Sequence, residues 1–340
     1  MCRKKPVISP RAASATRGGA EANDEDGEVR AITELGNERV AYFNGEILPE
    51  SRVAVSFRDT GFLYGDGVFD TTRTFGHKPF RLGDHVQRLF RSLRATGIDP
   101  GLTPERTIEI TEDVLARNLH LIDADDDYWV TQRVTRGVKT IEGDLTDVHE
   151  PTVIVECTPL PIKARARLFR DGIDVVVPSV RRVPPESLSP RIKTQNYLNL
   201  VMADREAKAR TPDAWAILLD TNGNLCEGMG SNIFLVRDGR LLTPQARHVL
   251  PGISRQTVIE LAAGLGLPVE ETDIDLYDAY TADEAFLTST SLCLCGIRNI
   301  NGQPLGAGAP PGPVTARLTE AYKELAGFDF VAQYLNRLNG

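Results

Sequence analysis

Six short segments of the chain contain residue types that can bind ligands or take part in chemistry. One contains Lys193, whose primary amine can bond covalently to a carbonyl carbon. Another contains the carboxylate of Glu227, and a third contains Arg88, whose guanidinium can bind an oxyanion through two hydrogen bonds. In chain order the six segments are 64–73, 85–89, 193–199, 227–234, 250–255 and 288–291.

Several familiar catalytic patterns are missing from the sequence. It contains no GxSxG, no P-loop, no HExxH and no GxGxxG after an expected strand. Its five histidines lack the spacing of metal ligands, and its five cysteines are scattered. These features argue against a hydrolase, a kinase, a zinc enzyme and a simple dehydrogenase, and they predict no metal site.

Taken in order, the six segments resemble those of the class IV aminotransferases, the fold-type IV enzymes that use pyridoxal 5'-phosphate (PLP). That family includes branched-chain amino acid aminotransferases, D-amino acid aminotransferases, (R)-selective amine transaminases and aminodeoxychorismate lyase. The resemblance runs from about Val40 into the C-terminal region. It implies a two-domain α+β or α/β fold like that of D-amino acid aminotransferase, with a small N-terminal and a larger C-terminal α/β domain. It also implies a homodimer.

The resemblance makes Lys193, in the pattern Lys-x-x-Asn-Tyr, the catalytic residue. PLP needs a primary amine to hold its aldehyde as a Schiff base, and only lysine has one in its side chain. Once the substrate displaces this amine, the free amine is placed to carry a proton between the substrate and the cofactor. Glu227 matches the carboxylate that keeps the ring nitrogen of the cofactor protonated.

Other segments match the family's contacts to the phosphate and the ring. Arg88 matches the phosphate arginine of a His-x-x-Arg motif. Ile253 and Ser254 begin a helix expected over 252–266, where free N–H groups form an anion site. Tyr197 matches a tyrosine that binds the ring oxygen, in a loop one residue shorter than in the bacterial branched-chain enzyme. The predicted cofactor-binding residues are Arg88, Lys193, Tyr197, Glu227, Ile253, Ser254, Ser289 and Thr290.

The residues expected to contact the substrate do not match one family member throughout. When Val-Thr-Arg-Gly at 134–137 is aligned with the branched-chain enzyme, the Tyr-x-Arg of that enzyme falls on Trp129 and Thr131. The arginine that helps to receive a carboxylate is therefore absent there. Arg133 lies two residues farther, on the same strand face, where it could substitute or form a salt bridge. The predicted substrate-binding residues are Tyr64, Phe69, Arg73, Trp129, Thr131, Arg133 and Ser291.

Several functions therefore stay open. The favoured one transfers an amino group from a branched-chain or apolar amino acid to a 2-oxo acid such as 2-oxoglutarate or pyruvate. A D-amino acid or (R)-amine donor is an alternative, since the run 182–185 resembles (R)-amine transaminases. A PLP lyase of the aminodeoxychorismate type and a non-catalytic ligand-binding homologue are the others.

The elements that must position these residues can be read from periodicity and turn residues. Asn44-Gly45 between apolar residues predicts a tight hairpin. Helices are expected after Asp84, taken as an N-cap, and from Thr103-Pro104. Strands are expected near 128–135 and 151–157. The predicted organisation is a disordered extension at 1–37, a small α/β domain at 38–157, a linker at 158–165 and a large PLP-binding domain at 166–340.

Composition limits the partners that we expect. The net charge is −8 and no basic cluster stands out, so nucleic acid is not expected as a partner. No apolar run approaches the roughly 20 residues of a membrane helix, and the N-terminal residues lack the apolar core of a secretory signal. A cytoplasmic location follows by default, with a small amino donor and a 2-oxo acid acceptor as partners.

Overall fold

The first elements of the chain form the hairpin that the sequence predicts. Strands β1 (Val40–Phe43) and β2 (Glu46–Pro49) are joined by Asn44 and Gly45, whose φ angles of 47° and 103° suit a two-residue turn. The structure is a computed structural model that describes residues 37–144, 147–306 and 308–338. The extension predicted at 1–37 therefore lies outside the described residues, except for Asn37.

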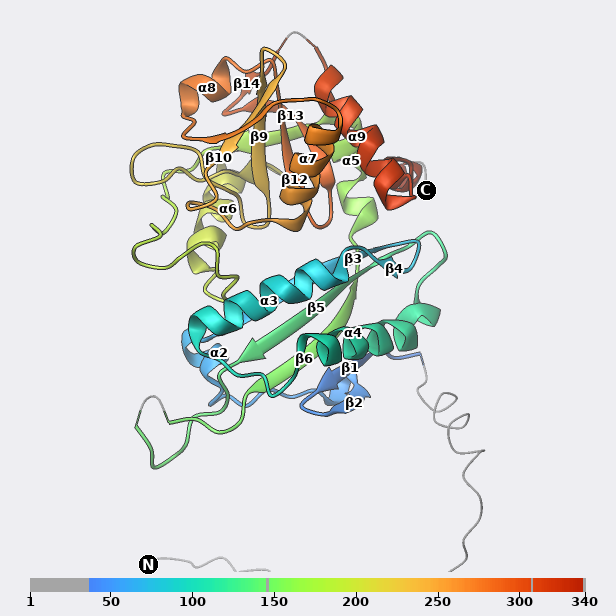
Figure 1. Ribbon diagram of the computed structural model, residues 1–340, viewed down its shortest axis with the longest axis vertical. Coiled ribbons are helices and arrows are strands. Elements are labelled where there is room, and N and C mark those ends of the chain that lie inside the picture. Colours follow the sequence, from blue (N-terminus) through green and yellow to red (C-terminus); the bar gives the residue numbers. More distant parts are fainter. Residues whose placement is uncertain (1–36, 145–146, 307, 339–340) are drawn as a thin grey trace, which may run out of the picture. The chain divides into compact units, whose positions relative to one another are not determined.

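The hairpin is the edge of a six-stranded antiparallel sheet with the order β2-β1-β6-β5-β3-β4 (Figure 1). Its other strands are β3 (Gly67–Phe75), β4 (Lys78–Pro79), β5 (Tyr128–Thr135) and β6 (Thr152–Pro159). Helices α3 (Leu82–Thr96) and α4 (Pro104–Asn118) cover one face of this sheet. Leu89, Leu93 and Val114 of these helices pack against the apolar side chains of the strands.

The two helices begin differently. α4 begins as predicted, because the Thr103 hydroxyl accepts a hydrogen bond from the Arg106 N–H at 3.1 Å. α3 begins three residues earlier than predicted, with Arg81 in a left-handed conformation at its N-cap. Asp84 is therefore not the N-cap. It lies in the first turn of the helix, where it pairs with the Arg81 side chain.

A second, mixed sheet has the order β11-β10-β9-β12-β13-β7-β8, and β14 pairs with β13. Its strands are β7 (Ile173–Val176), β8 (Trp215–Ala216), β9 (Asn232–Arg237), β10 (Arg240–Pro244), β11 (Val269–Thr272), β12 (Glu284–Ser289), β13 (Cys293–Ile300) and β14 (Gln303–Pro304). The helices of this half are α5 (Ile162–Asp171), α6 (Leu198–Arg210), α7 (Ile253–Gly264), α8 (Leu276–Tyr280), α9 (Pro313–Ala326) and α10 (Phe330–Leu335).

The second sheet has an apolar core on each face. Residues of α7 and α9 pack on one face, where Phe234 and Phe286 stack with their centroids 5.0 Å apart. Residues of α5 and α8 pack with another cluster that contains Ile233 and Leu287. Because β9 and β12 are covered on both faces, their residues are buried almost throughout. These central strands therefore give fixed end points for the loops that follow them.

The connection between the two sheets is shorter than predicted. Thr158 and Pro159 continue β6, paired with Trp129 and Tyr128, and α5 already begins at Ile162. Proline is compatible with this position because it lies at the end of the strand. The expected linker at 158–165 is thus reduced to two residues, while the division into domains at 38–157 and 166–340 stays a prediction. The chain from Glu38 onward forms one compact unit.

The remaining short elements are α2 (Thr60–Tyr64), η1 (Glu50–Arg52), η2 (Leu119–Leu121) and η3 (Asn336–Leu338). In the part of the chain that the structure describes, no helix has the length and apolar character needed to cross a membrane.

Candidate functional site

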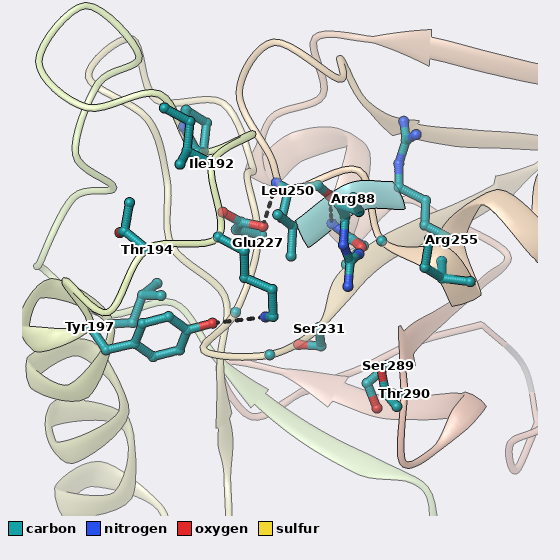
Figure 2. A pocket seen from close by; sticks show the side chains of 18 of the residues that line it. Arg88, Ile192, Thr194, Tyr197, Glu227, Ser231, Leu250, Arg255, Ser289 and Thr290 are labelled. Atoms are coloured by element: carbon teal, nitrogen blue, oxygen red, sulfur yellow. Dashed lines mark hydrogen bonds between the residues drawn. The ribbon is translucent and has the colours of Figure 1, made fainter. Parts of the chain in front are cut away.

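Residues from both halves of the chain line one polar cavity, here called the first cavity (Figure 2). All eight residues predicted to bind the cofactor lie on its wall. They are Arg88, Lys193, Tyr197, Glu227, Ile253, Ser254, Ser289 and Thr290. They come from α3, the loop before α6, the loop before β9, the start of α7 and the end of β12. The structure thus brings together residues that are up to about two hundred positions apart in the sequence.

Lys193 is held by its backbone between β3 and α3. Its N–H donates to the Ser92 hydroxyl at 3.2 Å, and its carbonyl accepts from the Phe69 N–H at 3.0 Å. Its Nζ donates to the Tyr197 hydroxyl at 3.2 Å and lies 4.4 Å from the centroid of the Phe69 ring. No carboxylate among the described residues lies within 4.0 Å of this amine. The amine therefore faces the cavity with an aromatic wall beside it.

Glu227 is a buried residue on the wall of the first cavity. One carboxylate oxygen accepts from Arg182 Nε at 3.0 Å, and the other accepts from the Leu250 N–H at 2.8 Å. Burial raises the pKa of the Glu227 carboxyl, and the Arg182 guanidinium opposes that rise. Each oxygen keeps a further lone pair, so the carboxylate can still accept from a ligand N–H.

Arg88 is oriented by a buried acid that sequence reasoning missed. Its Nε and Nη2 donate to the two oxygens of Asp70 at 2.8 and 2.7 Å, and its Nη1 donates to the Pro251 carbonyl at 3.0 Å. His85 Nδ1 lies 2.7 Å from the same carboxylate. Burial alone would raise the pKa of Asp70, but Arg88 and His85 hold that pKa well below its usual range. Two N–H groups of the Arg88 guanidinium stay available to a ligand.

The start of α7 lies beside Arg88. Its N-cap is Gly252, which supplies no side-chain acceptor, so the N–H groups of the first turn are free for an anion. A Cβ at this position would lie 2.2 Å from the Asn232 Oδ1, so any other residue would displace the Asn232 side chain. The Ser254 hydroxyl donates to the Ser289 carbonyl at 3.0 Å, which joins the helix start to the end of β12.

Two residues on the wall of the first cavity have a buried side-chain oxygen with no hydrogen-bond partner among the described residues. The two atoms are Ser231 Oγ and Thr288 Oγ1. Buried polar atoms are nearly always hydrogen-bonded, so these two indicate that a polar ligand completes the site. The donors around Arg88 and α7 suit a phosphate, the Glu227 carboxylate suits a protonated ring nitrogen, and the Lys193 amine suits an aldehyde. The residues present therefore fit PLP.

A second cavity, of about 890 Å³, shares Lys193, Tyr197, Ser289 and Thr290 with the first. Its volume lies in the range of small-molecule sites. Five of the seven predicted substrate residues line it, namely Phe69, Trp129, Thr131, Arg133 and Ser291. A substrate in the second cavity would thus have access to the Lys193 amine.

Arg73 and Tyr64 lie outside both cavities. Arg73 is on the same face of β3 as Phe69 but farther along the strand, where residues from the second half of the chain cover it. Its Nη1 donates to the Ser291 carbonyl at 2.8 Å, and its Nη2 donates to Gln333 at 3.1 Å. In the described chain, Arg73 therefore connects the two sheets instead of facing a ligand. Tyr64, on α2, is exposed to solvent.

Arg133 lines the second cavity but is engaged by an acid. Its Nη2 lies 2.8 Å from Glu156, on the neighbouring strand β6. The salt bridge, which was one of the two alternatives for this residue, is what the structure shows. Arg182 and Arg165 were missed together with Asp70. Only Asp70 had a usable signal, since a charged residue on the covered face of β3 needs a partner such as Arg88.

Comparisons with known proteins agree with this geometry. Residues 67–300 match the family model described as amino-transferase class IV. The chain is 38% identical over 285 residues to a Methanocaldococcus jannaschii protein named as a putative branched-chain-amino-acid aminotransferase, and the match covers 84% of this chain and 95% of that protein.

Two solved structures extend the likeness to the fold. The branched-chain aminotransferase of Thermoproteus uzoniensis, solved with norvaline, has a TM-score of 0.76 at 30% identity and covers 89% of this chain and 98% of its own. The branched-chain amino acid aminotransferase of Thermobaculum terrenum, solved in its PLP form, has a TM-score of 0.75 at 29% identity, with 88% and 97% covered. The fold predicted from the sequence is confirmed.

Proposed function

The chain belongs to the class IV aminotransferase family, and from that premise we propose that it transfers amino groups from branched-chain or other apolar amino acids to 2-oxo acids, with PLP as its cofactor. The observation that carries the proposal is one cavity wall that combines the Lys193 amine, the Glu227 carboxylate and the Arg88 guanidinium. The relatives solved with norvaline and in the PLP form support both the substrate class and the cofactor.

Lys193 is the catalytic residue of the proposed reaction. PLP, when bound, stabilises the negative charge that remains on a substrate carbon after its proton leaves. The Lys193 amine would hold the cofactor through its aldehyde, and as a free amine it would be placed to move a proton at the reacting carbon of the substrate. The hydroxyl of Tyr197, 3.2 Å from this amine, orients it.

The other residues of the first cavity hold the cofactor and its charge. Glu227 would keep the ring nitrogen of the cofactor protonated, and Arg182 favours the ionised form of Glu227. Arg88, the N–H groups at Ile253 and Ser254, and the loop at 289–290 would hold its phosphate.

The second cavity supports an apolar donor. Phe69, Trp129 and Met229 on its wall can cover a branched side chain, whereas the hydroxyl of Ser291 can donate to a carboxylate. A D-amino acid or (R)-amine donor and the lyase reaction are the alternatives that the test must separate.

The test is a visible absorption spectrum of the purified protein with PLP, recorded during addition of amino donors. We expect a visible band that L-leucine bleaches and 2-oxoglutarate restores, with no such response to D-leucine or an (R)-amine. The variant Glu227→Gln should keep the band but lose about 10²-fold in turnover, because a neutral amide does not stabilise the proton on the ring nitrogen of the cofactor as a carboxylate does. A protein that stays colourless, or turnover that needs no 2-oxo acid, would refute the proposed function.

We also propose that the chain forms a homodimer. Apolar side chains at Phe57, Phe62, Leu63 and Tyr64 are exposed within a short stretch of chain, and such exposure is typical of interaction surfaces. Phe62→Glu should therefore lower the mass measured by sedimentation to that of a monomer, whereas Tyr277→Glu, at another exposed aromatic residue, should not. A wild-type protein that sediments as a monomer would contradict the dimer.

A further inference from the structure

Arg165, in the first turn of α5, projects into the second cavity between two indole rings. Its guanidinium carbon lies 5.0 Å from the ring centroid of Trp129 and 5.4 Å from that of Trp215. Its Nη1 donates to the hydroxyl of Ser291. Contacts with two aromatic faces and one hydroxyl fix the plane of this guanidinium within the cavity.

Arg165 differs from Arg133 and Arg298 of this wall in its lack of an acid, and it differs from Arg167 in being partly buried. Arg133 pairs with Glu156, and Arg298 pairs with Asp174. Within the described ranges, no carboxylate lies within ion-pair distance of Arg165. Burial lowers the pKa of Arg165, yet a guanidinium keeps its charge in proteins. A partly buried cation without an acid is costly, so this position favours an anionic ligand.

The neighbours of Arg165 are residues of the reaction site. Ser291 directly follows Thr290, which lines both cavities together with Lys193. Trp129, which Arg165 contacts, and Thr131 occupy the positions of the Tyr-x-Arg pattern in branched-chain enzymes. β5 therefore lacks the arginine of that pattern, and Arg133 is already used by Glu156.

We propose that Arg165 binds a carboxylate of the substrate and thereby replaces, from α5, the arginine that is absent at position 131. This inference rests on the proposed function. A guanidinium has five N–H donors, and the hydrogen bond to Ser291 uses one of them. The remaining donors can form two parallel hydrogen bonds to a carboxylate in the cavity. Arg165 thus determines whether a substrate with a carboxylate is bound in preference to a simple amine.

The inference is tested by calorimetric binding of unreactive ligands to the PLP-loaded protein. The ligands are 4-methylpentanoate with one carboxylate, glutarate with two, and 4-methylpentanamide with none. Arg165→Met should weaken carboxylate binding by about ten- to hundredfold, as expected for the loss of charged hydrogen bonds, and leave the amide unchanged. Arg165→Lys keeps the charge but cannot form two parallel hydrogen bonds, so its affinity for the carboxylates should lie between those of the wild type and Arg165→Met. Arg167→Met, an exposed residue of the same helix and cavity wall, is the matched control and should bind like the wild type.

The pattern of losses identifies the carboxylate. Weaker binding of glutarate alone indicates the side-chain carboxylate of a dicarboxylic substrate, and weaker binding of both acids indicates the α-carboxylate. Either result supports the inference, whereas unchanged acid binding, or an equal loss for the amide, overturns it. If Arg165→Met does not retain PLP, the Arg165→Lys series decides by the same criteria. A wild-type protein that binds both acids through Arg165 but transfers no amino group would refute the proposed function and leave this inference intact.

Discussion

Replacing Lys193 by alanine should lower the rate of amino transfer by about 10⁴-fold, because one amine both holds the cofactor and moves the proton. No other described lysine can substitute for it. The only other lysine on the wall of the second cavity, Lys208, is paired with Asp204 at 2.8 Å. The phosphate-binding residues are unchanged in the variant, so PLP should still bind, but its visible band should shift. A shifted band would show that the variant still binds PLP, so its lower rate would not be caused by loss of the cofactor.

The experiment compares single-turnover rates of the wild type, Lys193→Ala and Lys208→Ala at saturating PLP. Lys208→Ala removes an amine of the same type from the same cavity, and its rate should stay within about twofold of the wild type, as for an exposed ion pair. Lys193→Ala with a rate near that of the wild type, or with an unshifted band, would contradict the role of Lys193.

The cofactor site could be predicted from the sequence because its residues lie in short segments with special local structure. The phosphate-binding N–H groups require a helix start, which the Pro-Gly-Ile-Ser sequence at 251–254 predicts locally. Lys193 and Glu227 belong to loops in which the neighbouring positions also accept few residue types. Gly228, for example, has no room for a Cβ, which would lie 2.5 Å from the Ala216 carbonyl. Such local requirements can be read from a single sequence.

The substrate side could not be predicted to the same degree because it depends on contacts between distant elements. Arg73 and Phe69 share a face of β3. Their environments differ only because Gln333 and Ser291 cover the end of the strand that carries Arg73. Arg165 was missed because its segment was taken for a linker. β6 pairs with β5 as far as Pro159, so the helix α5 that follows it begins close to Trp129 of β5.

Asp70→Asn is expected to destabilise the protein by about 3–5 kcal/mol, since it leaves the Arg88 cation buried without its acid. This corresponds to a melting temperature lower by about 10 °C. The folded-state pKa of Asp70 lies far below its unfolded value of about 3.9, so its stabilising effect is complete above that value and is lost as the pH falls. The difference between wild type and variant should therefore be constant from about pH 5 upward and shrink below about pH 4.

Thermal unfolding of the PLP-free and PLP-loaded proteins measures this effect and also tests the role of Arg88. If the cofactor phosphate binds Arg88, it partly replaces the missing carboxylate, so PLP should stabilise Asp70→Asn more than the wild type. Asp113→Asn, which breaks the exposed pair of Asp113 with Arg117, is the control and should change the free energy of unfolding by less than about 1 kcal/mol. An Asp70→Asn protein as stable as the wild type at neutral pH would show that Arg88 needs no buried acid. A loss of stability that PLP does not reduce would instead place the phosphate away from Arg88.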